Sequence, residues 1–207
     1  MGCTEREGLF GGAAGGGKSD ALLIDALQYV GHKDFSAIII RKTFSDLTKA
    51  DSLIPRAMEW LSGTGAHKRD GGKIWEFPSG ARLEFGHLDN VGDELNYQGG
   101  QYSYIGFDEL TQHNEAQYTY LFSRLRKSTD SGVPSKMRAT TNPGGPGHDW
   151  VRKRFISGFD GKSEKFLQDC SVDMGDPYGT VEFQRFFVPS LAVDNPSLDL
   201  EDYLLSL

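Results

Sequence analysis

Hydrophobic and polar positions follow two different periods near the start of the chain, and these predict a strand, a helix and a second strand. Phe35–Arg41 is a nearly continuous apolar run, which is typical of a strand buried on both faces of a parallel sheet. Asp20–Val30 has apolar residues at helical spacing, and Gly31 is expected to end that helix. Glu7–Phe10 predicts the end of a preceding strand. Together the three segments form a βαβ unit.

The remaining pattern continues this alternation. Further strands are expected at Tyr102–Phe107, Lys136–Thr141, Phe166–Val172 and Arg185–Val188. Further helices are expected at Thr43–Leu61 with a break near Pro55, at Glu115–Arg126 and at Trp150–Ile156. Lys73–Phe77 and Ala81–Phe85 alternate around a Pro-Ser-Gly turn, which predicts a β-hairpin. The pattern therefore predicts an α/β fold with a mostly parallel central sheet, flanking helices and a β-hairpin insertion.

Composition limits the classes of function. A chain of 207 residues with 38% hydrophobic content suits one α/β domain, and its net charge of −7 excludes a polycation. Any contact with nucleic acid must therefore be local. The two cysteines, Cys3 and Cys170, are isolated, which favours a reducing compartment, and neither a membrane-spanning run nor a signal peptide is expected. The five histidines lack metal-site spacing.

A glycine-rich segment near the N-terminus carries the first candidate chemistry. Gly12–Ser19 fits the phosphate-loop pattern G-x-x-x-x-G-K-[ST], in which open backbone N–H groups surround a polyphosphate. The loop precedes a predicted helix whose N-terminus favours anions. The alternative is a flexible linker that matches by chance. The candidate nucleotide-binding residues are Gly12, Ala13, Ala14, Gly15, Gly16, Gly17, Lys18, Ser19 and Asp20. Lys18 is expected to reach the β- and γ-phosphates, and Ser19 to bind Mg²⁺.

The strand Tyr102–Phe107 runs into two carboxylates, Asp108 and Glu109. Neighbours at a strand end point to different sides, so one can hold the metal while the other activates water. Such a pair also occurs where a strand simply meets solvent, but a phosphate loop upstream favours the catalytic interpretation. A glutamate directly after the aspartate favours a motor ATPase over a small-molecule kinase, which needs no water-activating group.

Other polar strand ends add candidate residues. Thr140, Thr141 and Asn142 follow the strand Lys136–Thr141 and can sense whether a γ-phosphate is present. Arg41, Arg124 and Arg126 are candidates for DNA contact or for an arginine finger, the arginine that a neighbouring subunit inserts toward the phosphate. For each of these residues the competing interpretation is an ordinary solvated strand end or helix face.

Six segments in a fixed order resemble a known family. They are Phe10–Ser19, Ile40–Leu47, Pro78–Arg82, Tyr97–Gly99, Tyr104–Thr111 and Thr140–Trp150. Together they resemble the ATPase domain of the large terminase subunit of tailed bacteriophages, over nearly the whole chain. The resemblance implies a P-loop NTPase fold of the RecA-like, ASCE class. It also implies an ATP- and Mg²⁺-dependent motor that moves double-stranded DNA into the procapsid.

The family also implies roles and partners. Carried over, Lys18 and Ser19 bind phosphate and Mg²⁺, Asp108 holds the metal, Glu109 activates water, and Thr140–Asn142 couple hydrolysis to movement. The implied partners are DNA, the portal, the small terminase subunit and further copies in a ring. The implied location is the host cytoplasm during assembly rather than the mature virion.

The chain departs from the family in three ways. Relatives are usually about twice as long and carry a C-terminal nuclease domain. In this chain residues 1–190 are expected to form the ATPase domain and residues 191–207 an acidic tail. Nuclease activity is not expected from it. Little sequence precedes the loop to recognise adenine, and the loop lacks the arginine that many relatives have. Two alternatives stay open: a helicase-like or other ASCE motor, or a nucleotide-binding module without turnover of its own.

Overall fold

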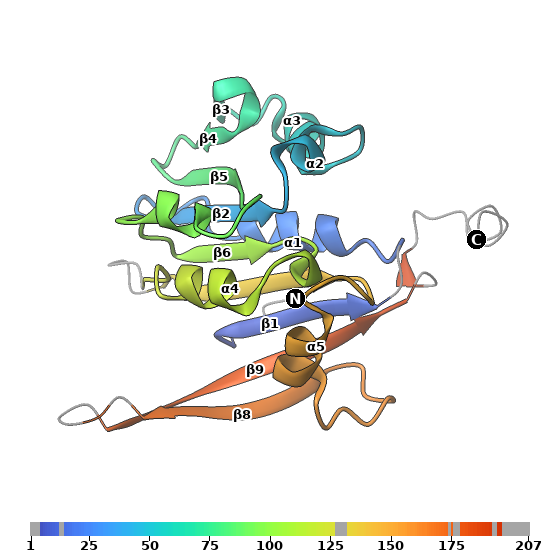
Figure 1. The fold of residues 1–207 in the computed structure, drawn as a ribbon. Helices are drawn as coiled ribbons and strands as arrows, with labels where there is room; N and C mark the ends of the chain where they lie inside the picture. Colours follow the sequence, from blue (N-terminus) through green and yellow to red (C-terminus); the bar gives the residue numbers. More distant parts are fainter. Residues whose placement is uncertain are drawn as a thin grey trace, which may run out of the picture.

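The structure is a computed structural model that describes residues 5–12, 15–126, 132–173, 175, 179–191 and 194–195. Within these residues, nine strands form one sheet in the order β3-β4-β5-β2-β6-β7-β1-β9-β8 (Figure 1). The strands are β1 Glu7–Gly12, β2 Ser36–Arg41, β3 His67–Arg69, β4 Ile74–Glu76, β5 Arg82–His87, β6 Tyr104–Phe107, β7 Lys136–Thr141, β8 Phe166–Asp173 and β9 Thr180–Ser190. All neighbours from β5 to β9 pair in parallel. The predicted mostly parallel α/β fold is confirmed.

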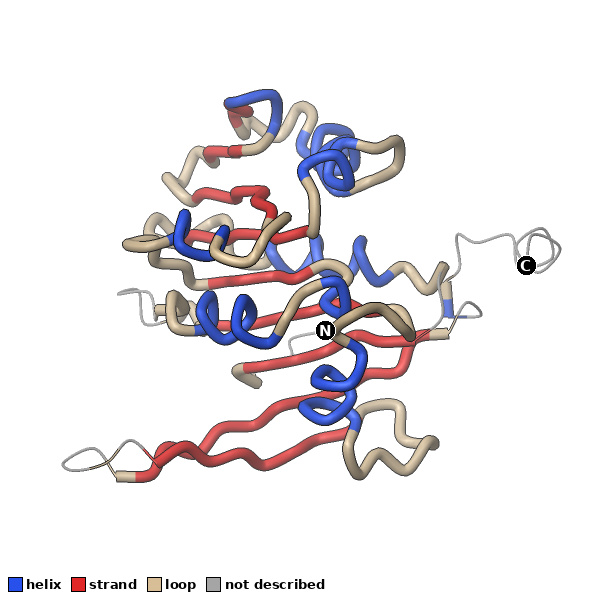
Figure 2. Tube along the Cα trace, viewed as in Figure 1, coloured by secondary structure: helices blue, strands red, loops and turns tan. Residues whose placement is uncertain are grey.

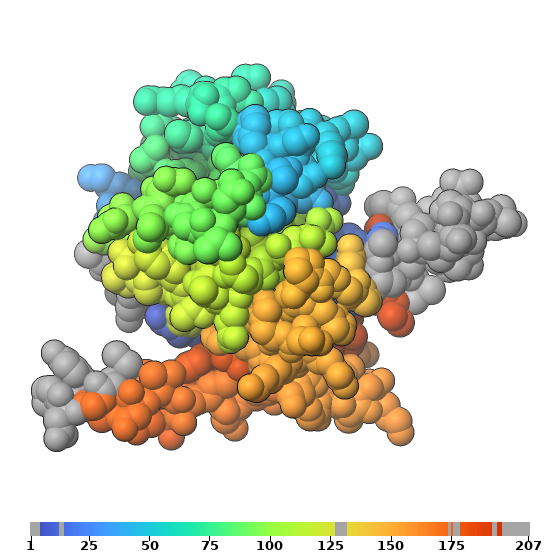
Figure 3. All heavy atoms as spheres, viewed as in Figure 1, coloured from blue at the N-terminus to red at the C-terminus, as the bar shows by residue number. Residues whose placement is uncertain are grey.

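Antiparallel strands extend this parallel centre at both ends. On one side β4 pairs with β5 and β3 pairs with β4. The β4–β5 pair is the predicted hairpin, with Ile74 opposite Glu84. On the other side β8 pairs with β9, and Figure 3 shows this hairpin projecting beyond the body of the molecule.

Helices cover both faces of the sheet (Figure 2). They are α1 Lys18–Leu27, α2 Phe44–Thr48, α3 Leu53–Leu61, α4 Glu115–Phe122 and α5 His148–Val151, which continues as a π-helical turn, η4 Arg152–Ile156. Short 3₁₀ turns are η1 Asp70–Gly72, η2 Asp93–Tyr97 and η3 Leu110–Gln112. In the described part of the chain no helix is long and apolar enough to cross a membrane.

Strand β2 shows why the sheet needs both helical layers. Ala37 and Ile39 pack in one core with residues of α1 and α3. Ile38 and Ile40 pack in a second core with residues of α4 and of the α5–η4 segment. All four side chains are at most 1% exposed, so the apolar run predicts the environment of the strand correctly.

Four predicted helices have boundaries that differ from the structure. Helix α1 begins at Lys18 and not at Asp20, and it ends at Leu27, before the predicted end at Val30, because residues 28–30 form turns. The break in Thr43–Leu61 lies between Thr48 and Leu53, and Pro55 sits in the first turn of α3, where its missing N–H costs no hydrogen bond. The predicted helix from Glu115 ends at Phe122 and not at Arg126, because the chain turns to bring Arg124 beside Tyr102. The basic helix begins two residues early, at His148.

The ends of the chain are described only in part. Cys170 lies half-buried in β8 with a free thiol, whereas Cys3 lies outside the described residues. Strand β9 ends at Ser190, which is the predicted end of the domain. Most of the predicted tail, 191–207, lies outside the described residues, so this division of the chain stays a prediction.

Candidate functional site

The phosphate-loop motif connects the end of β1 to the start of α1. Its glycines adopt backbone conformations that L-residues rarely take, with φ of 80° at Gly15 and 68° at Gly17. Gly12 also passes so close to β9 that a Cβ there would lie 2.0 Å from the Ser190 carbonyl oxygen. Ala13 and Ala14 are outside the described residues.

A cavity of about 320 Å³ opens at the carboxyl edge of β1, β6 and β7. It brings together residues of all three predicted motifs: Gly15, Gly16, Gly17, Lys18, Ser19, Asp20, Asp108, Glu109, Thr140, Thr141 and Asn142. These residues lie far apart in the sequence and meet because parallel strands deliver their carboxyl ends to one edge.

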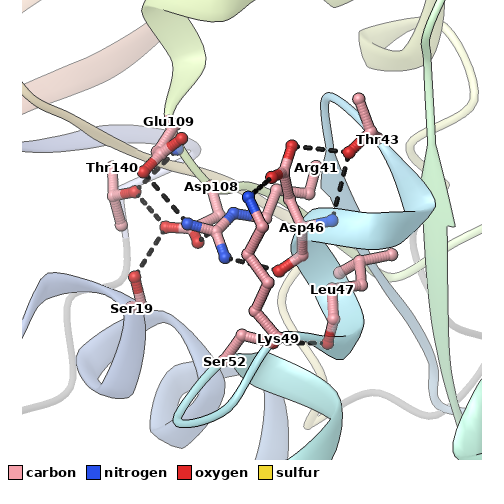
Figure 4. A network of polar contacts seen from close by, with 10 residues as sticks. All are labelled: Ser19, Arg41, Thr43, Asp46, Leu47, Lys49, Ser52, Asp108, Glu109 and Thr140. Carbon is pink, nitrogen blue, oxygen red and sulfur yellow. Dashed lines mark hydrogen bonds and ion pairs between the residues drawn. The ribbon is translucent and has the colours of Figure 1, made fainter.

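Asp108 is fully buried at the centre of this cavity wall. Its Oδ1 accepts hydrogen bonds from Ser19 Oγ at 2.9 Å and from Thr140 Oγ1 at 2.6 Å (Figure 4). Its Oδ2 lies 3.2 Å from Arg41 Nε. Mg²⁺ prefers oxygen ligands and usually keeps several of its waters, so it needs few ligands from the protein. The adjacent Ser19 hydroxyl and Asp108 carboxylate fit this requirement.

Glu109 has an unusual backbone, with φ 58° and ψ 54° in the left-handed region. Its N–H donates to Thr140 Oγ1 at 3.0 Å, and its Oε1 lies 3.0 Å from Arg41 Nη2. The side chain is 37% exposed, so it reaches the cavity while Asp108 stays buried. Strained backbone of this kind concentrates at functional sites, where the surrounding contacts hold it.

Charged groups of both signs meet at the loop. Burial lowers the pKa of the Lys18 ammonium, while the Asp108 and Glu109 carboxylates oppose that shift. The Lys18 Nζ lies 3.5 Å from the Gly12 carbonyl oxygen, beside the open loop. Burial raises the pKa of the Asp20 carboxyl, against the opposing effect of Arg56. A bound polyphosphate would therefore contact the Lys18 ammonium, which burial already shields from water.

Thr140–Asn142 connect the cavity to a neighbouring helix. Beside the Thr140–Asp108 bond, Thr141 Oγ1 donates to Thr111 Oγ1 at 3.1 Å. The Thr111 carbonyl in turn accepts from the Gly147 N–H at 2.7 Å, directly before α5. This geometry gives the predicted coupling residues a hydrogen-bonded route to α5, although their role stays a prediction.

Asp51 also lines the cavity and was not predicted. Three further residues at the site were not predicted, and each contacts a distant partner. Arg56 of α3 lines the cavity, with its Nη1 2.6 Å from Asp20 Oδ2. Ser190 Oγ donates to the Gly16 carbonyl at 3.1 Å, and Asn195 Nδ2 donates to the Gly15 carbonyl at 2.7 Å. No motif marks these residues, because their partners lie 36 to 180 positions away in the chain.

The three candidate arginines lie at different edges of the sheet. Arg41 contacts both catalytic candidates, as described above. Arg124 and Arg126 lie beside Tyr102, before the amino end of β6, and do not line the cavity. Within one chain they are therefore distant from the phosphate loop, and a role in a neighbouring subunit stays a prediction.

The left-handed backbone of Glu109 predicts an unusual order of stability. Glu109→Gly should be more stable than Glu109→Ala by about 1 kcal/mol, because only glycine adopts this conformation without a steric cost. Both variants lose the same side-chain contacts. Urea unfolding measures the difference in the free energy of unfolding between the two variants. The same pair of substitutions at exposed Glu59 within α3 is the control, and there glycine should be the less stable by about 1 kcal/mol. Equal stability of the two variants at 109 would contradict the prediction.

The glycine-rich loop after β1, the carboxylates after β6 and the strand order that places β7 between them define the fold class as that of a phosphate-loop NTPase. Residues 9–152 match the family described as terminase large subunit, T4likevirus-type, N-terminal. The chain therefore belongs to this terminase large-subunit family. No curated protein matches it.

Solved structures give the same fold. The large terminase of a thermophilic bacteriophage in complex with ADP superposes with a TM-score of 0.67 at 17% identity, over 98% of this chain and 44% of that one. The same terminase in complex with ATP-γ-S gives a TM-score of 0.64 at 17% identity, over 98% and 43%. The chain thus spans less than half the length of these relatives.

Proposed function

We propose that this chain is the ATP-hydrolysing part of a motor that packages double-stranded DNA into a phage procapsid. The observation that carries the proposal is the single cavity in which Lys18, Ser19, Asp108 and Glu109 meet. Membership of the terminase large-subunit family supports it. The related terminase of the thermophilic bacteriophage was solved with ADP and with ATP-γ-S, which supports a nucleotide as ligand.

The roles follow from position. The loop N–H groups and Lys18 hold the β- and γ-phosphates, and Ser19 and Asp108 hold Mg²⁺. An ion held by Ser19 and Asp108 would supply positive charge beside the phosphate oxygens. Glu109, which is exposed to the cavity, accepts a proton from the attacking water. Thr140 touches both acidic residues and so responds when either moves.

The same proposal includes the partners that a packaging motor needs. They are double-stranded DNA, the portal, the small terminase subunit and further copies of the chain in a ring, in the host cytoplasm during assembly. Residues 1–190 supply the ATPase domain in this proposal.

A second candidate is a nucleotide-binding module that turns over only when assembled. The observation that favours it is the pairing of both arginines at the site with carboxylates of the same chain, Arg41 with Asp108 and Glu109, and Arg56 with Asp20. Robust turnover by the isolated chain would exclude this candidate, whereas turnover only with portal and DNA would support it.

Replacing the loop lysine tests the proposed function. Lys18→Ala should weaken ATP binding by about tenfold or more, because it removes a charge-assisted contact to phosphate in a buried position. Binding of a fluorescent ATP analogue and release of phosphate are measured with DNA and portal present. Lys68→Ala removes an equal charge from the exposed strand β3 and should change neither quantity. A wild-type chain that neither binds nor hydrolyses ATP would overturn the proposal.

A further inference from the structure

The π-helical turn η4 carries two neighbouring cations that point away from the core. Arg152 and Lys153 are both exposed, and neither side chain makes a hydrogen bond or an ion pair with a residue that the structure describes. The next residue, Arg154, is instead held by the buried Glu7 carboxylate, with its Nε 2.6 Å from Glu7 Oε1. Because the whole chain has a net charge of −7, two adjacent cations without such partners form a local positive site.

A second cavity, of about 420 Å³, opens beside these two side chains. Arg152 and Lys153 line it together with the Asp149 carboxylate and the Ser157 hydroxyl. The charged lining therefore has one positive charge in excess, and it lies at the Arg152–Lys153 side of the cavity. The α5–η4 segment belongs to the face of the molecule that Figure 3 shows (orange).

The backbone that bears the two cations is fixed from the core side. Val151 and Phe155 are each 1% exposed and pack in the second core. The Arg154 side chain contacts Glu7 of β1, and the Arg154 carbonyl accepts from Arg185 Nη1 of β9 at 2.9 Å. A ligand that binds the exposed side of η4 therefore does not have to order its backbone, which lowers the cost of binding. Turns of π-helix are frequent at functional sites.

The same segment is attached to the chain that follows Glu109. Trp150 Nε1 donates to the His113 carbonyl at 2.9 Å, and the Gly147 N–H donates to the Thr111 carbonyl at 2.7 Å. Thr111 belongs to η3, which begins directly after Glu109, and His113 ends it. The contact is close, because a Cβ on Gly147 would lie 2.5 Å from the His113 carbonyl oxygen. A ligand held at η4 would thus have a fixed place relative to the ATP cavity.

The chemistry of the second cavity fits a phosphate backbone. Arginine and lysine side chains are the usual partners of backbone phosphates in protein–DNA complexes. Single strands, by contrast, are commonly bound by stacking of their bases on aromatic side chains. Phe159 also lines the cavity, but its ring already packs against Phe187 and Phe166, with centroid distances of 5.1 and 5.8 Å. The site therefore favours a duplex, whose bases stay paired.

We propose that Arg152 and Lys153 form a binding site for the phosphate backbone of double-stranded nucleic acid. The choice of a duplex as ligand rests on the proposed packaging function. Asp149 repels phosphate, so the backbone lies at the side of the two cations. The site is separate from the ATP cavity and does not include the arginines considered above.

Duplex binding without ATP tests this site. Arg152→Ala/Lys153→Ala should raise the Kd of a fluorescent duplex of about 30 base pairs by about tenfold or more. It should also lower the slope of log Kd against log salt concentration by about two, because each lost phosphate contact releases about one counterion fewer. Two duplexes of unrelated sequence should be affected equally. Lys33→Ala/Lys68→Ala removes the same charge from exposed positions outside both cavities and should change neither quantity.

Asp149→Asn should have the opposite effect and lower the Kd of the duplex by about twofold or more, because it removes a like charge from the same cavity. Circular dichroism identifies a variant that fails to fold, and the remaining variant then decides the matter. An unchanged Kd in either folded variant, or a wild-type chain that binds no duplex, would overturn the inference. Displacement of the duplex by inorganic phosphate at constant ionic strength would indicate a site for the free anion and would overturn it too. A wild-type chain that binds the duplex but neither binds nor hydrolyses ATP would overturn the proposed function and leave this site supported.

Discussion

Glu109→Gln is expected to reduce ATP turnover by about 10²- to 10⁴-fold while nucleotide binding stays at the wild-type level. The amide cannot accept the proton of the attacking water, so the step that needs a base is lost. Its side-chain oxygen can still accept from Arg41 Nη2, and the Glu109 N–H still donates to Thr140, so the geometry of the cavity is preserved. Single-turnover phosphate release and binding of a fluorescent ATP analogue measure the two quantities separately.

The matched control for this substitution is Glu164→Gln, which makes the same change at an exposed carboxylate outside the cavity. It should leave both turnover and binding unchanged. Normal hydrolysis by the Glu109 variant would show that another group activates the water. A loss of ATP binding in the same variant would show that Glu109 serves the fold or the nucleotide rather than the chemical step.

Glu7→Ala is expected to destabilise the fold by about 3 kcal/mol, because it leaves two partly buried arginines without their counter-charge. The Glu7 carboxylate is fully buried. Its Oε1 lies 2.6 Å from Arg154 Nε and accepts from the Tyr118 hydroxyl at 2.8 Å, and its Oε2 lies 2.7 Å from Arg185 Nε. Burial by itself would lower the pKa of Arg154, but the Glu7 carboxylate, together with Tyr118 and Glu115, outweighs this effect and raises the pKa.

Urea unfolding measures the change in the free energy of unfolding. Glu76→Ala is the control, since Glu76 pairs at 2.7 Å with Arg69, which is 67% exposed. Ion pairs of that kind contribute only about 0–1 kcal/mol. If Glu7→Ala and Glu76→Ala cost the same, the buried network does not hold β1, β9, α4 and η4 together.

The sequence predicted the parts of the fold that depend on local pattern. The apolar run of β2, the loop after β1 and the strands ending at Phe107 and Thr141 all lie where their residues indicate. The shared sheet edge followed from these assignments, because parallel strands place their carboxyl ends together. Asp108, Glu109 and Thr140 therefore meet as their positions along the chain imply.

Features that depend on contacts between distant segments were not predictable. Arg56 reaches the cavity only because α3 packs beside α1, and Asn195 reaches the loop only because β9 pairs with β1. Glu7 looks like an ordinary polar residue at the start of a strand until Arg154 and Arg185 are brought to it. The sequence predicted a helix break near Pro55, but Pro55 lies in the first turn of α3 and the break precedes it. A proline in a first turn is compatible with a helix, so it does not mark the position of the break.

Strand β9 joins two distant places on the molecule by a single stretch of backbone. Its eleven residues extend for about 35 Å, with Ser190 against the phosphate loop at one end and Thr180 in the projecting hairpin at the other. Residues 185–190 pair with β1, whereas residues 180–184 extend beyond the end of β1. A load applied to the hairpin would therefore travel along covalent bonds to the segment that closes over Gly12 and Gly16.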